Sequence, residues 1–265
     1  MSALKILSGG AAQGLIASLA PKFKALTGFD IEGEFGAVGA MADKLRKGTP
    51  ADIVVLTAAM VSDLVREKLV VSDLISDVGL VETAIAVRAG DPELTVNDAA
   101  ALREALLAAD AIFVPDTKAS TAGIHVAKVL QQLDIANEIA ARLQIFPNGA
   151  TAMRHLAESD AIRPIGCTQS TEIISTKGVV LSGSLPPGCE LSTMYTAGVT
   201  TAAANPRQAQ SLIELLIGAN QRELRTRAGF LSRKFYGCPR CRGTAETQLD
   251  GPAGQFHLGQ SRFIY

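Results

Sequence analysis

Residues 48–58 read Gly-Thr-Pro-Ala-Asp-Ile-Val-Val-Leu-Thr-Ala, and they carry the strongest structural signal in the chain. Gly48 favours the end of a preceding helix, because glycine adopts the left-handed conformation that often ends helices. From Asp52 to Leu56 the residues are nearly all apolar, which is typical of a parallel strand buried on both faces. This stretch therefore predicts an α/β fold.

Two strand–helix units precede this strand. Short apolar runs predict strands at residues 4–8 and 31–35. Apolar residues at helical spacing predict a helix over 15–27, and after the stretch Gly36-Ala37-Val38-Gly39-Ala40 a second helix is expected through Arg46 and Lys47. The first 70 residues are therefore expected to form a βαβαβα unit with right-handed crossovers.

The same alternation continues downstream. Further strands are expected at 81–89, 111–114, 143–146, 162–167 and 191–199, and further helices at 97–109, 123–133, 150–159 and 206–219. The two long strands, near 82–89 and 191–199, are natural crossings between two lobes without a shared sheet. The predicted organisation is a discontinuous first lobe (1–82 and 195–230), a second lobe (83–194) and an irregular C-terminal extension (231–265).

Composition excludes several classes of protein. The formal net charge is −1 with 25 basic and 26 acidic residues, whereas a nucleic-acid-binding protein needs a clustered surplus of Lys and Arg. No apolar run approaches the roughly 20 residues of a membrane span. The four cysteines do not form a secreted disulfide framework. We expect no contact with nucleic acid and no membrane insertion.

The last 35 residues differ in character from the rest, with neither helical nor strand periodicity. Cys238-Pro-Arg-Cys241 and His257 together are one ligand short of a zinc site, so a loosely ordered extension is the preferred interpretation. We expect neither a metal ion nor a cofactor.

Five segments, in order, carry a resemblance. They are Ile6-Leu-Ser-Gly-Gly-Ala-Ala, Phe35-Gly-Ala-Val-Gly, Gly48-Thr-Pro-Ala-Asp-Ile, Thr121-Ala-Gly-Ile-His-Val-Ala-Lys-Val-Leu and Ile165-Gly-Cys-Thr-Gln-Ser-Thr-Glu-Ile. Over residues 4–230 the chain resembles the molybdate-binding-protein-like substrate-binding proteins, a family that includes aconitate-isomerase-like members. The resemblance implies the two-lobed type 2 periplasmic-binding-protein fold, with two crossing strands and a cleft between the lobes that closes on a small anion.

The expected ligand loops lie where strands lead into helices. Free N–H groups at helix N-termini attract anions, and glycine lets the backbone approach a ligand closely. The residues expected to bind the ligand are Ser8, Gly9, Gly10, Ala37, Val38, Gly39, Ser120, Thr121, Gln169 and Ser170.

The first two of these loops depart from the family pattern. The resemblance implies hydroxyl side chains there, but this chain has Gly9, Gly10, Ala37 and Val38, with Ser8 as the nearest hydroxyl. A small oxyanion needs many short donors, since each unmet polar group costs about 1–3 kcal/mol. We therefore expect a di- or tricarboxylate in preference to molybdate.

Five side chains could carry chemistry or charge. Lys118 could neutralise a carboxylate, or be a solvated loop residue, and His125 could be an acid/base or a packing residue. Both are the catalytic candidates if the protein is an isomerase. Arg154 and His155 could reach the cleft or be exposed helix residues. Glu172 is expected to accept hydrogen bonds from loop N–H groups.

Three functions remain open. The preferred one is a monomeric binding protein that delivers the anion to an ABC transporter permease. The second is a cofactor-free isomerase that moves a proton along an unsaturated tricarboxylate, and the third is a ligand sensor. The resemblance implies the periplasm, while the N-terminus shows no signal-peptide pattern, which keeps a cytoplasmic location as an alternative.

Overall fold

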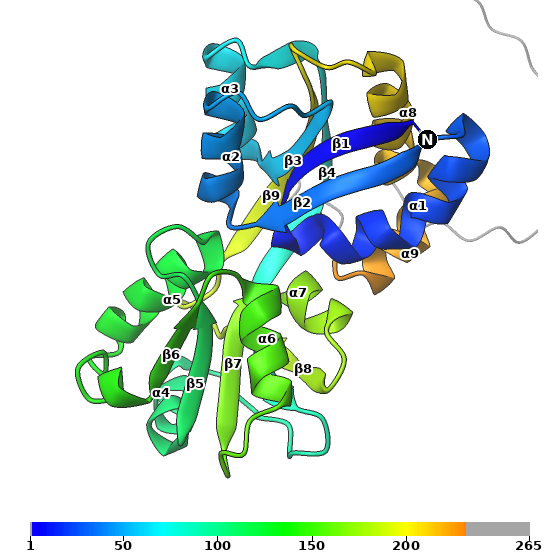
Figure 1. Ribbon diagram of the computed structural model, residues 1–265. Helices are drawn as coiled ribbons and strands as arrows, with labels where there is room; N and C mark the ends of the chain where they lie inside the picture. Colours follow the sequence, from blue (N-terminus) through cyan, green and yellow to red (C-terminus); the bar gives the residue numbers. More distant parts are fainter. Residues whose placement is uncertain (1, 232–265) are drawn as a thin grey trace, which may run out of the picture. The chain divides into compact units, whose positions relative to one another are not determined.

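The computed structural model describes residues 2–231. Its N-terminal part is the expected βαβαβα unit, with strand boundaries within a residue of those expected (Figure 1). Strand β1 lies between β2 and β3 and is parallel to both. The elements are β1 (Ala3–Gly9), η1 (Gly10–Ala12), α1 (Gln13–Thr27), β2 (Asp30–Gly36), α2 (Val38–Arg46), β3 (Ile53–Thr57) and α3 (Ala58–Arg66).

The next strand, β4 (Val70–Arg88), is far longer than the strand expected at 81–89. Its first part pairs antiparallel with β9 (Ser192–Thr200), ending at the pair Glu82 and Ser192. From Thr83 onward it pairs with β7 and β8 instead. We call the residues up to Glu82 and from Ser192 the first lobe, and residues 83–191 the second lobe.

The second lobe has its own α/β sheet, in which β5 lies between the parallel strands β6 and β7. Helices α4 and α5 lie on one side of this sheet and α6 and α7 on the other (Figure 1). The elements are α4 (Ala99–Ala108), β5 (Ala111–Pro115), α5 (Thr121–Gln132), η2 (Ala140–Arg142), β6 (Leu143–Phe146), α6 (Gly149–Ala157), β7 (Pro164–Gln169), α7 (Ser170–Ser175) and β8 (Val179–Ser184).

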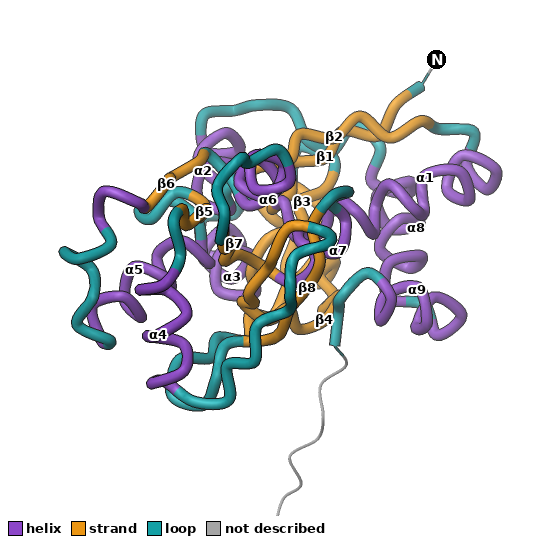
Figure 2. The backbone as a smooth tube through the Cα atoms, turned by 90° about the horizontal axis from the view of Figure 1, so that it is seen from below, coloured by secondary structure: helices purple, strands orange, loops and turns teal. Residues whose placement is uncertain are grey.

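The chain then returns to the first lobe through β9. Helix α8 (Pro206–Ile217) packs against α1, and its residues Leu212 and Leu216 are fully buried in the first-lobe core. This confirms the expectation that the helix after the second crossing packs on the first lobe. Two short helices follow, η3 (Ala219–Gln221) and α9 (Arg222–Arg227), and α9 lies near α1 and α8 (Figure 2).

One expectation about the sheets is wrong. We expected two sheets without a shared strand network, but hydrogen bonds connect the strands in the order β2-β1-β3-β9-β4-β7-β5-β6, with β8 also on β4. The reason is that β4 does not break at the crossing. The Thr83 N–H donates to the Leu191 carbonyl, while Thr83 also pairs with Gln169 of β7.

The buried side chains nevertheless form separate cores on either side of the crossing. One core combines residues from the start and the end of the described chain, from Leu4 to Phe230. Two further cores, which include Ile85 and Phe113, belong to the second lobe alone. The fold is thus two-lobed, while the domain boundaries suggested by the sequence stay a prediction. The expected extension at 231–265, including Cys238, Cys241 and His257, lies outside the described residues except for Leu231.

Candidate functional site: a cavity between the lobes

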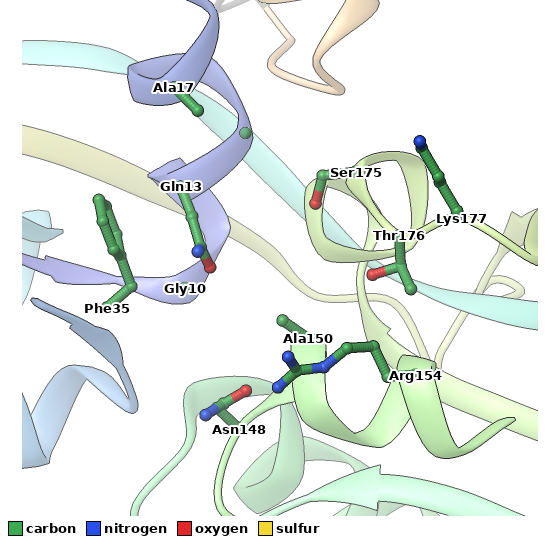
Figure 3. A pocket seen from close by; sticks show the side chains of 11 residues that line it. Gly10, Gln13, Ala17, Phe35, Asn148, Ala150, Arg154, Ser175, Thr176 and Lys177 are labelled. Carbon is green, nitrogen blue, oxygen red and sulfur yellow. The ribbon is translucent and has the colours of Figure 1, made fainter. Parts of the chain in front are cut away.

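A cavity of about 500 Å³ lies between the two lobes (Figure 3). Its volume is within the range of about 300–1,000 Å³ that is common for small-molecule sites. The first lobe contributes residues around the start of α1, and the second lobe contributes α6 and the end of α7. The lining residues are Gly10, Gln13, Gly14, Ala17, Phe35, Asn148, Ala150, Arg154, Ser175, Thr176 and Lys177.

Two cationic side chains belong to the second-lobe wall. The Arg154 guanidinium group donates a hydrogen bond to the Thr151 hydroxyl at 3.0 Å, and this contact holds the side chain against α6. The guanidinium extends across this wall toward Asn148, with Gln13 on the opposite wall (Figure 3). Lys177 follows α7, and neither cation has an acidic partner within salt-bridge distance among residues 2–231. Both charges are therefore available to an anion.

Helix starts on both walls add partial positive charge. Asn148 caps α6 by accepting a hydrogen bond from the Thr151 N–H at 2.8 Å. On the other wall, Gly10 opens η1, which leads directly into α1 at Gln13. The dipoles of both helices favour an anion, while the first N–H groups of α6 already donate to Asn148 and Glu172. The cavity is suited to a ligand with more than one negative group.

Glu172 lies behind the cavity wall and is almost fully buried. The Thr168 hydroxyl donates to its Oε2 at 2.6 Å, and the N–H groups of Gly149, Ala150 and Gln169 also donate to the carboxyl group. This confirms the expectation that Glu172 accepts hydrogen bonds from loop N–H groups. Burial raises the pKa of the carboxyl group above its usual range, although these donors act in the opposite direction.

Tyr195 of β9 lies next to the first expected ligand loop. A methyl group built on Gly9 would come 2.9 Å from its ring carbon Cε1 and 3.5 Å from its hydroxyl oxygen. Burial, followed by the neighbouring Glu172, raises the Tyr195 pKa, so the phenol stays protonated and can donate a hydrogen bond. Sequence reasoning missed this residue, because it lies within a crossing strand rather than in a loop.

The expected ligand residues of the first lobe gather around the same region. Gly10 lines the cavity, while Ser8 is fully buried and donates its hydroxyl to the carbonyl groups of Gly9 and Val55. The Ser8 hydroxyl hydrogen is thus used within the fold. The residues Ala37, Val38 and Gly39 start α2 and do not line the cavity.

The expected residues of the second lobe divide between two helix starts. Ser120 and Thr121 start α5, where a methyl group built on Gly39 would lie 3.5 Å from the Ala119 carbonyl oxygen, so the lobes approach closely there. Gln169 and Ser170 are buried at the start of α7. Both polar atoms of the Gln169 amide lack a hydrogen-bond partner among the described residues. Their ligand roles stay predictions.

The structure places neither catalytic candidate in the cavity. The His125 ring nitrogen Nε2 lies 2.8 Å from the Cys189 carbonyl oxygen, a contact that ties α5 to the segment before β9. Lys118 is exposed, and its backbone N–H is held by the Asp116 side chain. His155 stacks on Phe146 with 4.5 Å between the ring centroids. These contacts favour structural roles for His125 and His155.

The sequence left open whether Arg154 and His155 reach the cleft, and Arg154 does line the cavity. Gln13, Asn148 and Lys177 were missed. For Asn148 a signal was present, because Asn followed by Gly after the strand at 143–146 is a typical helix start. Within residues 2–231, no group of three or more His, Cys, Asp or Glu side chains is placed to hold a metal ion. Over the same residues, no helix combines the length and apolarity that crossing a membrane requires.

Comparisons with known proteins agree with this architecture. The periplasmic molybdate-binding protein of Azotobacter vinelandii superposes with a TM-score of 0.73 at 18% identity, over 87% of this chain and all of that one. The sulfate-binding protein of Mycobacterium tuberculosis superposes with a TM-score of 0.67 at 17% identity, over 87% and 86% of the two chains. These neighbours confirm the two-lobed periplasmic-binding-protein fold.

A relative identified by sequence is an aconitate isomerase from a Pseudomonas species. It is 26% identical over 227 residues, which cover 82% of each chain. The family model described as bacterial extracellular solute-binding protein matches residues 4–231, nearly the whole described chain. This protein therefore belongs to the bacterial extracellular solute-binding protein family.

Proposed function

We propose that this protein binds a small polycarboxylate anion in the cavity between its lobes. The observation that carries the proposal is the presence of Arg154 and Lys177 on a cavity of about 500 Å³ that also reaches the starts of α1 and α6. A tetrahedral oxyanion would fill only a small part of this volume. A di- or tricarboxylate can instead place separate carboxylates on separate cationic or N–H groups.

Membership of the solute-binding family supports a carrier role, with delivery of the anion to an ABC transporter permease and a periplasmic location. The neighbours whose printed names mention molybdate and sulfate support an anionic ligand. The aconitate isomerase relative supports a tricarboxylate in particular. The absence of hydroxyl side chains at Gly9, Gly10, Ala37 and Val38 argues in the same direction.

Calorimetric titration tests the ligand class. We expect purified protein to bind trans-aconitate, citrate or tricarballylate more tightly than molybdate or sulfate. Lys177→Gln should weaken polycarboxylate binding, on the order of tenfold, because one charge-assisted bond is lost. Lys128→Gln, which removes an exposed lysine on α5, is the matched control and should bind like the wild type. Tight molybdate binding with no response to any polycarboxylate would refute the proposal.

The second candidate is an isomerase that moves a proton along an unsaturated tricarboxylate. The observation that favours it is the aconitate isomerase relative, which spans 82% of this chain. Incubation with trans-aconitate, followed by ultraviolet absorbance and chromatography, tests it directly. Formation of cis-aconitate at a rate proportional to protein concentration would support the enzyme. Tight binding of trans-aconitate without any conversion would leave the carrier role.

A further inference from the structure

Glu172 occupies a position between two glycines of opposite lobes. A methyl group on Gly10, in the first lobe, would collide with its Oε1, and one on Gly149, in the second lobe, would collide with its Oε2. The carboxyl group therefore fits where both loops lack a side chain. Gly10 of the first lobe lines the cavity, and so does Ala150, which directly follows Gly149 in the second lobe. The two loops that enclose the carboxyl group therefore also border the cavity.

This carboxyl group has hydrogen-bond donors but no cation. Its donors are the Thr168 hydroxyl and the N–H groups of Gly149, Ala150 and Gln169. Among residues 2–231, no lysine, arginine or histidine lies within salt-bridge distance of it. A buried carboxylate without a cation is costly, so its ionised form is easily destabilised further by a second negative charge nearby.

We propose that the cavity binds its anion together with one proton, and that Glu172 carries this proton. An anion against Gly10 and Ala150 would lie close to the carboxyl group in a region of low dielectric, where two negative charges repel strongly. An ionised Glu172 would also hold the N–H groups at the start of α6 more strongly than the neutral acid. Binding of the anion therefore favours the protonated form, and the inference rests on the proposed binding of an anion in this cavity.

The surroundings of Glu172 support this assignment. Tyr195 on β9 lies close enough to Glu172 to feel its charge, and the raised pKa of Tyr195 keeps its phenol neutral. On the β7 strand, Cys167 has a pKa raised to about 12 by burial, so it also stays neutral. The other ionisable side chains on elements packed against α7, or directly after it, are Lys22, Lys24, Asp73, Asp77, Glu82, Arg88, Arg154, His155 and Lys177. Of these, His155 stacks on Phe146.

The test is calorimetry with trans-aconitate between about pH 6 and pH 9, where ordinary carboxyl groups, including those of the ligand, are ionised. Repeating each titration in buffers of different ionisation enthalpy gives the number of protons taken up. In the wild type we expect net proton uptake on binding, and an affinity that falls as pH rises, by up to about tenfold per pH unit, wherever Glu172 is ionised in the free protein. Glu172→Gln should bind with an affinity that does not change with pH and without proton uptake.

Two variants serve as controls. Glu158→Gln removes an exposed carboxylate at the far end of α6, and His155→Gln removes the nearby histidine; both should keep the wild-type pH dependence. Wild-type binding without proton uptake would overturn the inference, as would an unchanged pH dependence in Glu172→Gln. The wild-type uptake needs no variant, so it stands even if Glu172→Gln folds poorly. Absence of polycarboxylate binding at every pH would instead refute the proposed function.

Discussion

Gln169 is a residue whose burial and hydrogen bonding do not match. It is 3% exposed, yet both polar atoms of its amide lack a partner among the described residues. A buried polar group without a partner costs about 1–3 kcal/mol of stability. A side chain kept at such a cost at the start of α7 is a good candidate for contact with a ligand, as the sequence suggested.

Replacing Gln169 separates stability from binding. Gln169→Met should raise the free energy of unfolding in urea by about 1–2 kcal/mol, because the unmet amide is removed. It should also lower the affinity for trans-aconitate. Thr171→Val is the control, since the Thr171 hydroxyl is likewise buried without a partner but its methyl side lies next to Gly229 of the first lobe. This variant should gain stability and keep its affinity. Unchanged affinity in Gln169→Met would remove Gln169 from the site.

Glu172 should also make stability depend on pH in a particular direction. Its pKa is raised in the folded protein, so the folded state holds the proton more strongly than the unfolded state. This contribution is complete below the unfolded-state pKa of about 4.3 and is lost as pH rises toward the raised value. The stability of Glu172→Gln relative to wild type should therefore increase as pH rises above about 5. Urea unfolding at several pH values measures it, and a difference between the variant and the wild type that stays constant with pH would contradict it.

The residues of the site could be predicted only in part. The glycine loop at Gly10 and the acceptor role of Glu172 follow from local sequence, because turn geometry and a buried acidic side chain are local signals. Arg154, Lys177 and Tyr195 join the site through contacts between segments far apart in the chain. No local pattern distinguishes such an arginine or lysine from an ordinary exposed helix residue.

The start of α6 is the element on which the cavity depends most. Asn148 caps it, Gly149 leaves room for Glu172, and Ala150 lines the cavity. Gly149→Ala should destabilise the protein by about 1–3 kcal/mol, because a methyl group there would collide with the Glu172 and Thr168 side chains. Gly183→Ala on β8 is the control, since no atom lies within 4 Å of the added methyl group, and it should change stability by less than about 0.5 kcal/mol. Equal unfolding curves for the two variants would mean that Glu172 is not confined as described.

Among the elements, those with a clear period were found from sequence. The strand at 143–146 was located at its observed bounds, and the other expected helices and strands lie within a few residues of the observed ones, except that β4 begins at Val70 instead of residue 81. The first half of β4 was missed because Ser and Asp recur within residues 70–80 and interrupt any apolar alternation. Helix α7 and strand β8 were missed because they are six residues each, too short for a period to show.

At the scale of the whole described chain, the two crossings account for the site. Strand β4 leaves the first lobe and β9 returns to it, so the cavity walls come from residues far apart in sequence, near 10–17 and 148–177. The two-lobed fold could be predicted because alternating strands and helices with two long strands are visible in sequence. The cavity itself could not, since its charges depend on how the two lobes meet.

The central claim is that a polycarboxylate binds in this cavity and contacts its two cations. The measurement is the affinity for trans-aconitate of the double variant Arg154→Gln/Lys177→Gln, compared with Lys128→Gln/Arg207→Gln. The comparison variant removes the same number of positive charges from exposed sites on α5 and α8. We predict that the affinity falls by about 100-fold or more in the first variant, because the free energies of two charge-assisted contacts add. In the second variant the affinity should fall by less than about threefold. Equal affinities in the two double variants, with both folded, would contradict the claim.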